Sequence, residues 1–119
     1  MNYKNKNNSI YIDYKLSAEA FRAGLIPGII TAYWFKNDKQ IYPADRITKF
    51  KDWDRFYIPA VTGDQLNEFI PKNTVILRVD NKLWKAELPL EKIFAVGNSE
   101  AEAKLNYLKK LINKKLIKP

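Results

Sequence analysis

The sequence predicts an α+β fold, in which a small antiparallel sheet of about four to six strands packs with two short helices and a long C-terminal helix. Two observations predict this class. Short β-branched and aromatic runs alternate with polar turns between residues 29 and 97, which is typical of strands in hairpins. Residues 99–116 instead place apolar side chains at helical spacing. Because 119 residues suit one core, we expect a single α+β domain over residues 9–119. We expect the polar residues 1–8 to form a mobile tail.

The first elements are predicted from alternation and from helix-capping residues. The stretch "SIYIDYKL" places Ile10, Ile12 and Tyr14 on one side, as an edge strand would. Ser17 then suits the N-cap of a short helix through "AEAFRAG". Gly24 would supply the left-handed turn that ends this helix.

A β-hairpin is predicted next, from "IITAYWF", the polar turn "KNDK" and "QIY". Its first strand carries three consecutive rings, Tyr33, Trp34 and Phe35. Successive side chains of a strand point to opposite faces, so Trp34 lies opposite its two neighbours. The three rings therefore cannot form one flat surface on which bases stack.

The middle of the chain mixes charges and rings. We expect "ADRITKFKDWDRF" to form a structured loop with one turn of helix. In "YIPAVTGDQLNEFIP", Thr62 or Asp64 begins a short helix with apolar residues three and four apart, and Pro71 stops it.

The C-terminal part is predicted as a hairpin, a short strand and a helix. Two apolar runs flank Asp80 and Asn81, which suit a tight turn, and "IFAVGN" adds a strand. Asn98 or Ser99 caps the last helix, with Glu102 placed for a capping box. The predicted buried stripe consists of residues spaced by 4, 3, 4 and 4: Ala101, Leu105, Leu108, Ile112 and Leu116.

Composition removes whole classes of chemistry. The chain has no cysteine and no histidine, so thiolate sites, imidazole ligands and the common nucleophile–histidine pairs are excluded. Asp52 and Asp54 are flanked by basic residues and are interpreted as local ion pairs, and Asp64 as a favourable charge at a helix start. We therefore predict no enzyme, and no catalytic, cofactor-binding or metal-binding residue. No apolar run suits a signal peptide or a membrane span, so a cytoplasmic protein without a membrane partner is expected.

Two binding hypotheses remain. The preferred one is a protein partner, for which Trp53, Arg55 and Tyr57 are the predicted contacts, because interfaces are enriched in Trp, Tyr and Arg. Trp53 has an alternative role as a cap on the core. The sequence leaves the oligomeric state open.

The alternative is a nucleic-acid-binding accessory protein that uses terminal lysines and exposed aromatic residues. The formal charge is +8, and residues 99–119 carry six lysines against two glutamates. Lys110, Lys114 and Lys118, on the outer side of the predicted helix, would contact phosphates. The same lysines also suit a solvated face near the negative end of a helix dipole.

The order of several motifs resembles small phage and prophage proteins of unknown function. These motifs are "SAEAFRAGLIP", "IPAVTGDQLNEFIP", "LWKAE" and the final "SEAEAKLNYLKKLI", which together span about residues 16–113. The resemblance implies a small intracellular α+β protein of a mobile genetic element and carries no residue roles. Small phage proteins without catalytic residues commonly bind host proteins, so by analogy we expect a non-enzymatic module that acts on a host or phage factor.

Overall fold

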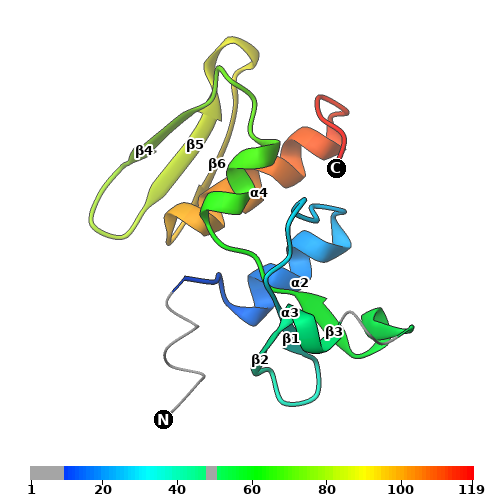
Figure 1. Ribbon diagram of the computed structural model, residues 1–119. Coiled ribbons are helices and arrows are strands. Elements are labelled where there is room, and N and C mark those ends of the chain that lie inside the picture. The colour runs from blue at the N-terminus through cyan, green and yellow to red at the C-terminus, as the bar shows by residue number, and fades with distance from the viewer. Residues whose placement is uncertain (1–9, 48–50) are drawn as a thin grey trace. The chain divides into compact units, whose positions relative to one another are not determined.

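A computed structural model describes residues 10–47 and 51–119 of the chain (Figure 1). The chain, for which one domain over residues 9–119 is predicted, groups into two compact units, Met1–Gln65 (unit 1) and Leu66–Pro119 (unit 2). The α+β class is confirmed. Six strands occur among the described residues, but they form two three-stranded sheets instead of one. The tail predicted over residues 1–8 lies outside the described residues.

The sheet of unit 1 contains the predicted hairpin. Strands β1 (Ala32–Phe35) and β2 (Ile41–Pro43) pair antiparallel, and β3 (Tyr57–Pro59) pairs antiparallel with the other side of β1. The strand order is therefore β2-β1-β3. Two short helices belong to the segment predicted as a structured loop, α3 (Ala44–Ile47) and the 3-10 helix η1 (Trp53–Arg55).

Helix α2 (Tyr14–Arg22) corrects the prediction of an edge strand that extends to Tyr14. Its N-cap is Asp13, whose carboxylate accepts a hydrogen bond from the Leu16 backbone N–H at 2.8 Å. The helix therefore starts four residues before the position that a Ser17 cap would give. Asp and Ser are equally good N-caps, so the local sequence did not distinguish them.

Ser17 has another role, in the packing of α2. Its side chain is buried, and its hydroxyl oxygen accepts a hydrogen bond from Trp34 Nε1 at 3.1 Å. A buried indole N–H needs such an acceptor. Gly24 follows the helix with φ of 83°, so the predicted left-handed turn is confirmed.

The core of unit 1 lies on the Trp34 face of its sheet. Trp34 is 4% exposed, and the ring of Tyr14 meets it edge-on at a centroid distance of 6.1 Å. The buried cluster consists of Ala18, Ala32, Trp34, Ile41, Ile58 and Ala60. This face supplies the rigid support for the opposite face, where Tyr33 and Phe35 lie.

The helix predicted after Thr62 forms as a 3-10 helix, η2 (Asp64–Phe69), and Pro71 follows it. Thr62 and Gln65 cap its start reciprocally. Thr62 Oγ1 accepts from the Gln65 backbone N–H at 3.1 Å, while Gln65 Oε1 accepts from the Thr62 backbone N–H at 3.0 Å.

Unit 2 is a sheet of three strands with one helix on it. Strands β4 (Val75–Arg78), β5 (Trp84–Leu88) and β6 (Ile93–Gly97) follow one another in the antiparallel order β4-β5-β6. The hairpin turn is at the predicted place, where Asp80 Oδ1 accepts from the Lys82 backbone N–H at 2.8 Å. A 3-10 helix, η3 (Pro89–Glu91), connects β5 to β6.

Helix α4 (Glu100–Asn113) contacts β4, β5 and β6 from one side of the sheet (Figure 1). The predicted cap is confirmed, because Ser99 Oγ accepts from the Glu102 backbone N–H at 3.1 Å. The start of the helix lies close to β6. A Cβ on Gly97 would stand only 2.4 Å from the Ala103 backbone nitrogen, so this position admits no side chain.

The buried face of α4 differs from the predicted stripe. Leu105 and Leu108 are fully buried as expected, but Leu111 is buried in place of Ile112, and Leu116 is 46% exposed. The helix ends at Asn113, before Leu116 is reached. Residues four apart on an α-helix differ by about 40° around the helix axis. Successive spacings of four therefore move the predicted stripe off the buried side of α4.

Candidate binding surfaces

The face of the unit 1 sheet opposite Trp34 is covered with aromatic rings. Cross-strand pairing sets Tyr33 opposite Tyr42, and Phe35 opposite Tyr57, so these four rings share one face. The centroids of Phe35 and Tyr57 are 5.0 Å apart, and those of Tyr33 and Trp53 are also 5.0 Å apart. Tyr33 is buried, so we call the other four rings, Phe35, Tyr42, Trp53 and Tyr57, together with Phe56 the ring surface.

The ring surface contains two adjoining cavities. One has a volume of about 350 Å³ and is lined by Phe35, Lys51, Asp52, Trp53, Phe56 and Tyr57. The other, of about 380 Å³, is lined by Phe35, Lys36, Asn37, Arg55 and Phe56. Phe35 and Phe56 line both cavities, so the Phe56 side chain, which is 53% exposed, stands where the two meet.

The three residues predicted to contact a protein are brought together here. Trp53 and Tyr57 line the first cavity, and Arg55 lines the second, with its guanidinium carbon 5.8 Å from the Phe56 ring centroid. Trp53 packs on the Tyr33 ring but is only half-buried. The side chain therefore covers a packed ring and is also partly accessible to a partner.

Phe56 is the residue that the sequence interpretation missed. It follows Arg55 in a charged segment without regular alternation, so periodicity gave no signal for it. Its backbone is fixed at both ends. The Phe56 N–H donates to the Trp53 carbonyl at 3.0 Å, and the Phe56 carbonyl accepts from the Lys36 N–H at 2.8 Å. The exposed ring is therefore presented by an ordered backbone.

Hydrogen bonds at the edge of the ring surface connect the hairpin turn to neighbouring side chains and to η1. Tyr42 donates its hydroxyl proton to Asp38 Oδ2 at 2.6 Å. This hydrogen bond raises the pKa of Tyr42, and burial raises the pKa of Tyr33. Lys36 Nζ donates to the Asp54 carbonyl at 2.9 Å and links the turn to η1.

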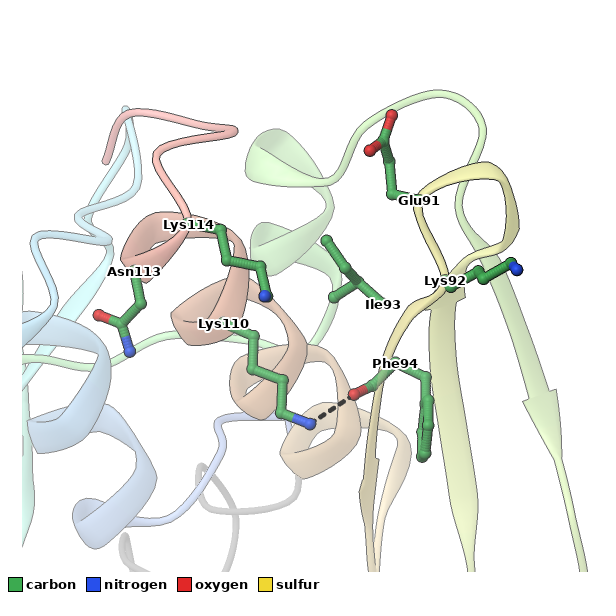
Figure 2. Close-up of a pocket in the computed structure, with 7 residues that line it drawn as sticks. All are labelled: Glu91, Lys92, Ile93, Phe94, Lys110, Asn113 and Lys114. Atoms are coloured by element: carbon green, nitrogen blue, oxygen red, sulfur yellow. Dashed lines mark hydrogen bonds between the residues drawn. The ribbon is translucent and has the colours of Figure 1, made fainter.

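A second cavity-bearing surface lies on unit 2 (Figure 2). Its cavity has a volume of about 430 Å³ and lies beside β6 and the last turns of α4. The lining residues are Glu91, Lys92, Ile93, Phe94, Lys110, Asn113 and Lys114. Lys110 Nζ donates to the Phe94 carbonyl at 2.6 Å. Figure 2 shows Lys110 and Lys114 projecting from α4 toward β6, whereas Lys92 points away from α4.

The structure brings together only two of the three lysines predicted to contact nucleic acid. Lys110 and Lys114 line this cavity, but Lys118 does not. The prediction that Lys118 lies on the outer side of the helix is wrong, because α4 ends at Asn113. Lys115 then has φ of 60°, a left-handed conformation that turns the chain away from the helix.

Within residues 10–47 and 51–119, no three of the Asp and Glu side chains lie close enough together to hold a metal ion. No helix in the same ranges is both long and apolar enough to cross a membrane. Comparisons with protein-family models, with curated proteins and with solved structures gave no match. Function is therefore inferred from the two surfaces themselves.

Proposed function

We propose that this protein is a non-enzymatic binding module, and that its ring surface binds a segment of a host or phage protein. The observation that carries the proposal is the position of Phe56, which is 53% exposed and lines two cavities, one with three other rings and one with Phe35 alone. Aromatic side chains, including Phe, are enriched in protein interfaces, and Trp and Tyr are among the residues that dominate their binding energy.

The energetics support a protein contact of moderate strength. Complete burial of a phenylalanine contributes about 1.5–3 kcal/mol, so covering the exposed half of Phe56 contributes about 1 kcal/mol or slightly more. Trp53 and Tyr57 add apolar area at the same place. Trp53 and Tyr57 already pack on neighbouring rings, so these two side chains lose little freedom on binding.

The lining also indicates which kind of segment fits. The ring lining suits an apolar anchor side chain from the partner. Three basic side chains and one acidic side chain line the two cavities: Lys36, Lys51, Arg55 and Asp52. A partner segment in which acidic residues flank an apolar anchor is complementary to this charge.

The test compares Phe56→Ala with Leu90→Ala. Leu90 is 85% exposed on unit 2 and lines none of the three cavities, so its substitution removes exposed apolar surface that does not belong to the ring surface. Tagged wild-type protein captures partners from bacterial lysate, and each captured protein is purified and titrated calorimetrically.

We expect Phe56→Ala to weaken binding about tenfold or more, which corresponds to about 1.4 kcal/mol. Leu90→Ala should leave the affinity unchanged, and both variants should melt close to wild type because both side chains are exposed. Equal affinities of wild type and Phe56→Ala for every captured protein would overturn the proposal.

A further inference from the structure

A second surface, on unit 2, carries features that the proposed protein contact does not use. We infer that the cavity beside β6 and the end of α4 binds single-stranded nucleic acid, with a base stacked on Phe94 and phosphates held by Lys110 and Lys114. The inference is independent of the ring surface. It combines an exposed ring, two lysines that line one cavity, and the cavity itself.

The ring is presented outward by the alternation of β6. Ile93, Ala95 and Gly97 are buried on the side of α4, whereas Phe94 and Val96 face outward. Phe94 is 51% exposed. An exposed aromatic ring offers a face to any base, and stacking of this kind depends little on base identity.

The Lys110 ammonium group lies at the ring itself, and Lys114 lines the same cavity. Lys110 Nζ is 5.3 Å from the Phe94 centroid, and Lys85 Nζ is 5.6 Å from the same centroid. Lys85 is neutralised by Glu87, whose carboxylate lies at 3.6 Å. Lys110 instead donates to a backbone carbonyl, which uses one of its three N–H donors and leaves the other two for a ligand.

The charge of the cavity favours an anion. Three lysines and one glutamate line it. Within residues 10–47 and 51–119, no carboxylate lies within 4.0 Å of Lys110 or Lys114. The end of α4 contributes a partial negative charge of about half an electron, which the lysines outweigh. Unit 2 as a whole has eleven basic and six acidic side chains, a formal charge of +5.

The form of the ligand follows from the geometry. A base reaches the face of Phe94 only if it is unstacked, and duplex DNA presents its phosphates but hides its base faces. The cavity of about 430 Å³ is a hollow beside a strand. Readers of duplex DNA instead insert a protruding helix or β-ribbon into a groove. A single strand therefore fits this surface better than a duplex does.

Side chains also block the pairing of an added strand with the edge of β6. Lys110 bonds the Phe94 carbonyl, and Asn106 Nδ2 donates to the Val96 carbonyl at 2.9 Å. These side chains occupy the acceptors that an added strand would need, so a partner that pairs with this edge is disfavoured. The same bond gives Lys110 a structural role, which the experiment has to separate from binding.

The probe is a fluorescently labelled twelve-nucleotide poly-dT strand, titrated with the full chain by anisotropy at several salt concentrations. Lys110→Ala/Lys114→Ala should weaken binding at least tenfold and lower the slope of log K against log salt by about 1.4, since each phosphate contact in a single strand contributes about 0.7. The matched control, Lys72→Ala/Lys82→Ala, removes the same charge from exposed positions of unit 2 that do not line the cavity.

Phe94→Ala should weaken binding about tenfold without changing the salt slope, because it removes stacking and no charge. Lys114→Ala alone, at an exposed C-cap position, shows the charge effect without loss of the Lys110 bond. Equal losses in the cavity and control double variants, unchanged binding by Phe94→Ala, or equally tight binding of a twelve-base-pair duplex or of anionic phosphatidylglycerol vesicles would each overturn the inference.

Discussion

Replacement of Ser17 by alanine tests whether α2 is held to the sheet by one buried polar contact. Ser17 is fully buried, and its hydroxyl accepts the indole hydrogen bond of Trp34, a residue only 4% exposed. Removing the acceptor leaves a buried N–H without this partner, which costs about 1–3 kcal/mol. Alanine is the better helix former by about half a kcal/mol, so we expect a net loss of about 1–2 kcal/mol.

The assay is urea unfolding followed by tryptophan fluorescence and far-UV circular dichroism. A loss of 1 kcal/mol lowers the melting temperature of a small domain by about 4–8 °C, so a thermal scan checks the same effect. A double-mutant cycle isolates the contact, because Trp34→Phe removes the donor. In that background Ser17→Ala should be nearly neutral or slightly stabilising. An equal loss from Ser17→Ala in both backgrounds would refute the reasoning.

Two further predictions concern packing and pH. Gly97→Ala should destabilise unit 2 by about 1–3 kcal/mol in urea unfolding, because the new Cβ would lie 2.4 Å from the Ala103 nitrogen; an unchanged midpoint would contradict the close approach of α4 to β6. Burial raises the pKa of Tyr107 above its usual value of 10.0, so its neutral form is favoured in the folded state. The stability that the neutral Tyr107 contributes should be complete below pH 10 and be lost as pH rises through its folded-state pKa. Thermal melts over a pH series should therefore show a smaller alkaline loss of stability for Tyr107→Phe than for wild type.

Local features of the fold could be predicted because their causes are local. Gly24 ends α2 with a left-handed residue, and Ser99 caps α4, because these roles depend on a few neighbouring backbone groups. The role of Ser17 depends on Trp34, which is 17 residues away, so only the packed structure reveals it. The strand β3 likewise joins its sheet by pairing with β1, from which β2 and two short helices separate it in the chain.

The candidate surfaces could be predicted in part. Trp53 and Tyr57 are residue types common at interfaces, so residue type alone directs attention to their segment. Phe56 could not be singled out, because its exposure depends on how η1 meets the end of β1. Lys118 was misplaced because the apolar pattern continues past Asn113, whereas the helix does not.

The most direct test of the proposed protein contact is site-specific photo-crosslinking in cells. Phe56 is replaced by p-benzoylphenylalanine in one sample, and Leu90 in a second. After irradiation, the adducts are identified by mass spectrometry, with nuclease treatment to remove contacts through nucleic acid. We predict a protein adduct that forms at position 56, survives nuclease and is absent at position 90. No adduct at position 56, or the same adducts at both positions, would contradict the account.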